Sequence, residues 1–416
     1  MSNGIAFQTG PESLLIRTRP ADRSPLFADS NRGDGMTGSA SSDTTDLLDC
    51  RFVIRAAGLA LDPGKLLLGG LALLILETGL NVILRLPFAE QAPPLHVRMS
   101  VDLGGSTVAQ FVGTGAGLLL APLQSIIGPG VEIFRSGSSW PELATAWTRL
   151  LWALLVWSLF GGAITRMTAV QFATSKRIGV RGGLRFALRQ LQNYMTAPFL
   201  PLAGIGCLLA FNAVLGAIAG LLGSVGETIL GVVWGLVLFC GLLMALLVIS
   251  VSVGWPLMVA AVSTEDSDGF DGLGRANGFL LDRPWRALLL VLLSLPVFAL
   301  GWLFAATLLS LTVYMADWAV ASGGPGQTAD WSFLLAPSIS ADVSPKTYWL
   351  ELPRLLLCGF GPSFFWCGIT VIYFLLRKSD DGTSLNDVTI HLDKPAEVAV
   401  DQSPEPPAET PMTNDH

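Results

Sequence analysis

Six long apolar segments decide what this chain can fold into. Each runs for about 20 residues or more with few charges, the length that an α-helix needs to cross a bilayer core of about 30 Å. Backbone in lipid must satisfy its own hydrogen bonds, so such segments form helices. They lie near residues 66–84, 147–169, 197–223, 227–254, 287–314 and 350–376. The expected fold class is all-α, a polytopic integral membrane protein.

The composition agrees with this class. Hydrophobic residues make up 51% of the chain and charged residues only 14%, whereas soluble domains carry about 25% charged residues. The net charge of -7 owes much to the acidic tail. The net charge therefore says little about a partner; nothing in the sequence suggests nucleic acid, and membrane lipids are the expected partners.

Both ends of the chain are polar. Residues 1–49 are rich in Gly, Ser, Asp and Arg, and residues 380–416 include the stretch "QSPEPPAETP". Such segments lack the apolar content needed to pack into a core. We expect both to be disordered, with a transmembrane helical bundle over residues 50–379.

A seventh apolar stretch, residues 107–132, is interrupted by glycines and two prolines. If it crossed the membrane, the basic cluster over 176–189 would lie outside, against the tendency of Lys and Arg to stay in the cytoplasm. The charge pattern therefore predicts six spans in the inner membrane, with both termini cytoplasmic. Residues 86–146 become an outer-face loop, in which 107–132 forms a helix that lies on that face or re-enters it.

The connector after the fourth span reads "TEDSDGFDGLGR" over 264–275. Asp268 or Ser267 is placed to cap a helix from about 268 to 281, with Asp271 in its first turn, where negative charge suits the helix dipole. The spacing predicts a cytoplasmic amphipathic helix on the membrane surface. Its apolar side would hold Phe270, Leu273, Phe279 and Leu280.

The connector after the second span, "TSKRIGVRGGLR" over 174–185, is similar to 264–275 at an offset of 90 residues. The matches are Thr174/Thr264, Gly179/Gly269, Gly182/Gly272 and Arg185/Arg275. A parallel internal repeat would explain them, with an amphipathic helix in each copy, and membrane folds often reuse such units. Because glycine is common in this chain, chance could also supply some of the matches.

Small residues recur at G-x-x-x-G spacing in the third and fourth spans, at Gly216 with Gly220 and at Gly231 with Gly235. Such spacing lets helix backbones approach closely in lipid. We expect these two spans to form a tight antiparallel hairpin.

Glu77, Asn81 and Arg85 are four residues apart and share one face of the first span. Charge at membrane depth often marks a transport pathway. The alternative, which we favour, is that Arg85 snorkels to the outer interface while Glu77 and Asn81 bond to neighbouring helices.

A second group of polar residues forms a candidate cytoplasmic interface. Arg166 could pair with an acidic connector residue or a lipid phosphate, although a positive-inside anchor is the favoured reading. The acidic residues of 264–275 lack the regular ligand spacing of a calcium-binding loop. Helix capping and pairing with the connector arginines are therefore favoured over a cation site. The interface comprises Arg166, Arg185, Asp268, Asp271, Arg275, Arg283 and Arg286.

Four blocks carry a resemblance to a known group of proteins. They are "ALDPGKLLLGG" (60–70), "FGGAITRMTAVQFA" (160–173), "WPLMVAAVSTEDSDGFDGLGR" (255–275) with "RPWR" (283–286), and "FLLRKSDDGTSLND" (374–387). Together they resemble a family of uncharacterised multi-pass membrane proteins typical of planctomycete-type bacteria. More distantly, the span and amphipathic-helix units look like the membrane domain of bacterial glycerophosphodiester phosphodiesterases. The family has no established activity, so the resemblance implies no functional residue.

The sequence carries no nucleophile triad, phosphate loop or dinucleotide fingerprint in a suitable context. We therefore expect no enzyme, catalytic residue, metal or cofactor. The first functional hypothesis is a non-enzymatic organiser or accessory of membrane proteins or lipids, acting through its connectors. The alternative is a small-molecule or ion transporter that uses the bundle and the face of Glu77, Asn81 and Arg85.

Overall fold

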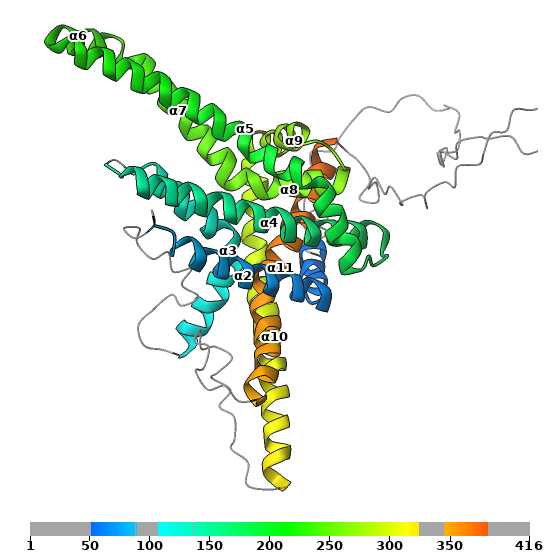
Figure 1. Cartoon of the computed structure of the whole chain (residues 1–416). Coiled ribbons are helices and arrows are strands. Elements are labelled where there is room, and N and C mark those ends of the chain that lie inside the picture. Colours follow the sequence, from blue (N-terminus) through cyan, green and yellow to red (C-terminus); the bar gives the residue numbers. More distant parts are fainter. Residues whose placement is uncertain (1–50, 88, 90–106, 136, 324–344, 382–416) are drawn as a thin grey trace, which may run out of the picture. The chain divides into compact units, whose positions relative to one another are not determined.

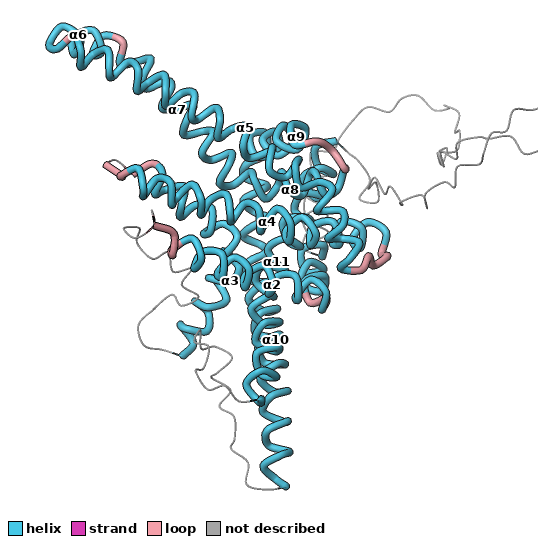
Figure 2. The backbone as a smooth tube through the Cα atoms, viewed as in Figure 1, coloured by secondary structure: helices cyan, strands magenta, loops and turns pink. Residues whose placement is uncertain are grey.

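The computed structural model describes residues 51–87, 89, 107–135, 137–323 and 345–381, and these segments are helices joined by short turns (Figures 1 and 2). Seven of the helices in this part of the chain are long and apolar enough to cross a membrane. The chain is thus an all-α, multi-pass membrane protein. The predicted disorder at 1–49 falls outside the described residues, as does almost all of the tail from 380 onward.

The helices follow the predicted spans but extend beyond them. A helical segment over 51–60 precedes α2. The helices that carry predicted spans are α2 (Pro63–Ile83), α4 (Trp140–Thr174), α5 (Val180–Leu221), α10 (Pro284–Gly323) and α11 (Pro345–Asp381), together with the composite fourth span. That span consists of α6 (Gly223–Val232), α7 (Trp234–Ile249), the π-helical turn η1 (Ser250–Gly254) and α8 (Trp255–Glu265). The other two helices are α3 (Thr107–Ile133), which is the seventh apolar stretch, and α9 (Gly269–Asp282).

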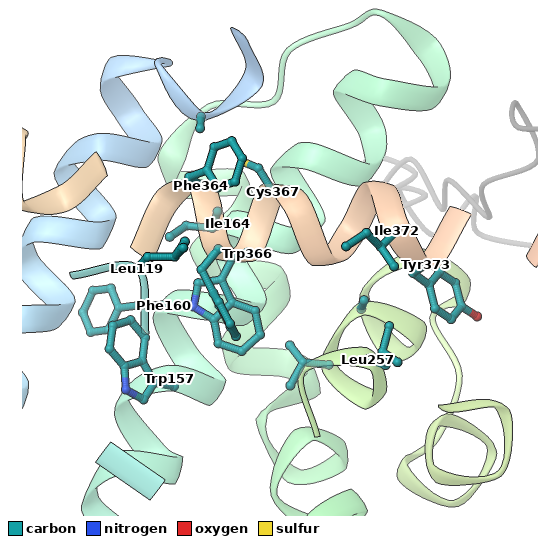
Figure 3. Packing of buried hydrophobic residues seen from close by; sticks show 14 of the residues in the cluster. Leu119, Trp157, Phe160, Ile164, Leu257, Phe364, Trp366, Cys367, Ile372 and Tyr373 are labelled. Carbon is teal, nitrogen blue, oxygen red and sulfur yellow. The ribbon is translucent and has the colours of Figure 1, made fainter. Parts of the chain in front are cut away.

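The core is built around α11, which packs against α2, α3, α4, α8 and α10. Trp366 of α11 is fully buried, with ring centroids 6.4 Å from Trp157 of α4 and 5.3 Å from Trp255 of α8. Figure 3 shows Trp366 close to Trp157, and Tyr373 further along α11 with its hydroxyl directed away from the cluster. A tryptophan cluster of this kind fills the centre with apolar rings.

Glycine permits one close crossing, between α2 and α11. A Cβ atom on Gly359 would lie 2.7 Å from the backbone nitrogen of Gly70 and would also overlap the carbonyl of Leu66. The predicted close packing at the G-x-x-x-G motifs is wrong, because Gly216, Gly220, Gly231 and Gly235 all face open space. The hairpin of α5 with α7 does form (Figure 1), although these four glycines do not lie at its contact.

Side chains from distant parts of the chain meet where several helices begin or end. Lys65 Nζ lies 2.9 Å from Gln171 Oε1, so the start of α2 meets the end of α4. Arg189 near the start of α5 lies 3.1 Å from Asp266, just after α8. Arg283, just before α10, lies 3.9 Å from Asp380 in the last turn of α11. Further along the same pairs, Trp152 contacts Leu76, Tyr194 contacts Ser263 and Trp302 contacts Phe360, so the three pairs run antiparallel.

The two connectors differ. The second forms the separate helix α9, within one residue of the predicted bounds, and Asp268 Oδ1 accepts a hydrogen bond from the Asp271 amide at 2.9 Å. This confirms the predicted N-cap. The first forms no separate amphipathic helix, since its residues from Val180 onward belong to the continuous α5. The expected symmetry of the two copies therefore fails at this point.

The predicted apolar side of α9 also needs correction. Phe279 is buried against the bundle, but Phe270 is 69% exposed. Nine residues separate them, which is two and a half turns of helix, so they point in opposite directions. The buried side is formed instead by Gly269, Gly272, Ala276 and Phe279.

Candidate functional site

A group of contacting polar side chains surrounds the last turn of α8. We call it the α8 junction: Ser263, Glu265 and Asp266, with the side chains that bind them. The partners come from α4, α5, α9 and α11, and they are Thr165, Arg166, Arg189, Gln190, Tyr194, Arg275, Tyr373 and Arg377.

Glu265 is the acidic centre of the junction, with a side chain only 10% exposed. The hydroxyl of Tyr373 donates a hydrogen bond to its Oε1 at 2.6 Å. Arg275 Nη1 lies 2.8 Å from Oε2, and Arg377 Nε lies 3.4 Å from Oε1. One carboxylate thus joins α8 to α9 and α11.

Asp266 makes the corresponding link to α5. It ends α8 in the left-handed region, with φ of 54°, a conformation that Asp tolerates better than most residues. Arg189 Nη2 lies 3.1 Å from its Oδ2, and the amide of Gln190 donates to its Oδ1. Together with Arg275 bound to Glu265, these contacts confirm the predicted pairing with connector arginines for Glu265 and Asp266.

Ser263 links α8 to α4 and α5. Its Oγ lies 2.6 Å from Thr165 Oγ1 and 2.8 Å from the Tyr194 hydroxyl. Its carbonyl accepts a hydrogen bond from Arg166 Nη1 at 2.9 Å, and the Arg166 guanidinium also lies over the Phe186 ring at 4.1 Å. A deeply buried hydroxyl and carbonyl are thereby satisfied.

The structure separates the predicted interface residues. Arg166 is only 4% exposed, so it belongs to the interior and offers no surface to lipid or to a partner. Arg275 is in the junction, while Asp268 and Asp271 form the start of α9. Arg283 donates to Ser379 Oγ at 2.6 Å, and Arg185 is exposed on α5. Arg286 is half-buried on α10.

The predicted polar face of α2 lies elsewhere. Glu77, Asn81 and Arg85 are all exposed, and none of them lines either of the two apolar cavities that border α3. The structure therefore places these three side chains on an outward side of α2, away from those cavities.

Sequence reasoning missed several members of the junction. Ser263, Tyr194 and Tyr373 carry no charge, and Ser263 and Tyr373 lie in or at the end of apolar runs, so all three resemble ordinary helix residues. A fully buried Lys65, bound to the carbonyl of Leu59 at 3.1 Å and to Gln171, was missed as well. Its position at the start of an apolar run could have indicated a special role, but a lysine at such a position is also typical of a surface anchor.

The junction can hold helices together, and its two acidic groups are both engaged by arginines. Within the described segments, no group of three or more His, Cys, Asp or Glu side chains is arranged to hold a metal ion. No family model, curated protein or solved structure matches this chain.

Proposed function

We propose that this chain is a non-enzymatic inner-membrane protein that organises or assists membrane proteins or lipids. It crosses the membrane six times, and it works through its cytoplasmic connectors. Two features support this proposal: the antiparallel pairing of the helices, and an exposed apolar face beside the α8 junction.

The helix pairing supports six crossings. The start of α2 meets the end of α4, so if each helix crosses once, the end of α2 and the start of α4 share the opposite side. Near the start of α4, Arg149 lies 3.3 Å from Glu132 in the last turn of α3. Between α2 and α4 the chain must then make an even number of crossings. α3, the single helix described there, would then dip into the membrane from the outer side, with its end near Glu132 at that side.

The observation that carries the functional proposal is the outward side of α9 and the start of α10. Phe270 is 69% exposed, Leu281 71% and Trp285 81%. Phe270 and Leu281 are eleven residues apart, so they share one helix face. Beside them lies the exposed Arg283. Large apolar side chains among arginines suit either a headgroup layer or a partner protein.

The test replaces Phe270, Leu281 and Trp285 together by Ala and compares this variant with the unchanged chain. Trp140→Ala is the matched control, because Trp140 is 85% exposed at the start of α4. Each protein is purified gently from its native membranes, and co-purifying proteins and lipids are identified by mass spectrometry. Thermal unfolding checks that the variants fold.

We expect a stoichiometric protein or lipid to accompany the unchanged chain and Trp140→Ala, and to be lost from the triple variant. An identical set of companions in all three preparations would contradict the proposal. Solute uptake into liposomes that Glu77→Gln abolishes would favour the transporter instead.

A further inference from the structure

Two apolar cavities of about 400 and 210 Å³ lie next to each other along α3. Both include Ile127 of α3 and Ser252 of η1, so they form one continuous groove, which we call the α3 groove. Its walls come from α3, α4, α5, α7, η1, α8, α10 and α11. Cavities of several hundred Å³ are of the size that holds small ligands.

The shape of the α3 groove suits a hydrocarbon chain. Its lining follows α3 from Leu119 to Arg135, which is about 24 Å at 1.5 Å per residue. This length exceeds the depth of one leaflet, which is about 15 Å or half of the hydrocarbon core, so an acyl chain that spans one leaflet fits within the groove. The π-helical turn η1 borders both cavities, and such turns occur frequently at functional sites.

Only one residue in the lining of either cavity is charged, and it lies at the end of the groove. Arg135 is exposed just beyond the last turn of α3, and the nearby carboxylate of Glu132 is already bound to Arg149 at 3.3 Å. Trp140, at the start of α4, is 85% exposed, as is typical of the headgroup layer. An arginine at this level suits a phosphate, which it can bind through two N–H groups.

We propose that the α3 groove binds a phospholipid, with one acyl chain along α3 and the phosphate at the guanidinium of Arg135. A free fatty acid would fill the apolar part equally well, and arginine also binds carboxylates, so the experiment compares the two ligands directly. The site is separate from the exposed face of α9, and its occupancy does not depend on the function proposed above.

The experiment uses the full chain in nanodiscs of phosphatidylethanolamine and phosphatidylglycerol. A trace of phospholipid with a photoreactive acyl chain is added, and crosslinked peptides are mapped by mass spectrometry. Gly130→Leu blocks the groove, because a side chain there meets open space inside the larger cavity. Gly206→Leu is the control, since Gly206 also faces open space on a helix but lies outside both linings.

We expect crosslinks concentrated on residues 119–135 and 248–256 in the unchanged chain and in Gly206→Leu, reduced at least fivefold in Gly130→Leu. Arg135→Gln should reduce them at least threefold, and Arg181→Gln, which removes an exposed charge far along the sequence, should not. Labelling spread evenly over all lipid-exposed helices would overturn the proposal. So would equal labelling by a photoreactive fatty acid that Arg135→Gln leaves unchanged.

Discussion

At the scale of single residues, the carboxylate of Glu265 has the most partners in the α8 junction, since Arg275, Arg377 and Tyr373 all bind it. Replacing one partner of a fully buried ion pair costs about 3–5 kcal/mol, because the remaining charge stays buried. Here the side chain of Arg275 is 42% exposed and can turn to water. We therefore expect Glu265→Gln to lower the free energy of unfolding by about 2 kcal/mol.

Thermal unfolding in detergent, followed by circular dichroism, measures this change. Glu227→Gln is the control, because Glu227 is an exposed glutamate on α6 and its replacement should leave the midpoint unchanged. Equal midpoints for Glu265→Gln and the unchanged chain would show that the junction does not stabilise the fold.

The same residues show what the sequence could predict at this scale. The opposite charges of the two connectors predict that they pair. The ion pairs of Arg189 with Asp266 and of Arg275 with Glu265 confirm this prediction. Ser263 could not be predicted, because its hydroxyl partners lie 98 and 69 residues away and no charge marks them. Arg166 was placed at a surface for a similar reason: an arginine near a span end is usually an anchor.

At the scale of helices, the crossing of α2 and α11 depends on the missing side chain of Gly359. A methyl group there would overlap backbone rather than a movable side chain. We expect Gly359→Ala to destabilise the protein by about 1–3 kcal/mol, the usual cost of overpacking. Unfolding midpoints in detergent measure this loss of stability. Faster amide hydrogen exchange in α2 and α11 would show that the two helices have moved apart.

Gly216→Ala is the matched control on α5. Its new methyl group meets open space, and Ala is favoured over Gly within a helix by about 1 kcal/mol, so the midpoint should rise or stay the same. A loss equal to that of Gly359→Ala would mean that the G-x-x-x-G motif of α5 packs against another helix after all.

Helix positions were more predictable than helix faces. Apolar length alone indicated six of the long helices, because the bilayer demands about 20 apolar residues whatever their order. The buried face of α9 was not predictable in the same way. Four of its fourteen residues are glycine, and a glycine has no side chain that would mark a helix face as apolar. Gly269 and Gly272 nevertheless form the contact with neighbouring helices.

At the scale of the whole molecule, six and seven crossings make opposite predictions for two short segments. With six crossings, Pro87 before α3 and Ser138 after it lie on the outer side together; if α3 crosses, they lie on opposite sides. The native cysteines are first replaced by Ala, and single cysteines are placed at these two positions. Labelling in intact spheroplasts with a membrane-impermeant maleimide then distinguishes the two arrangements.

We expect the reagent to label Pro87→Cys and Ser138→Cys without permeabilisation, while Lys176→Cys and Ser267→Cys react only after the membrane is opened. Labelling of Ser138→Cys but not of Pro87→Cys would instead establish α3 as a crossing helix. The charge pattern predicts the first outcome, because a crossing α3 would place the basic cluster over 176–189 outside.

The composition of the α8 junction also has a consequence for biosynthesis. Glu265 is made well before Tyr373 and Arg377, which lie 108 and 112 residues later in the chain. While the ribosome works through α10, this carboxylate has only Arg275 as a partner from the described junction. Glu265 therefore gains its remaining partners only when α11, the last described helix, has been translated. A chain stalled before Tyr373 would expose this carboxylate without those partners to the proteases of the membrane.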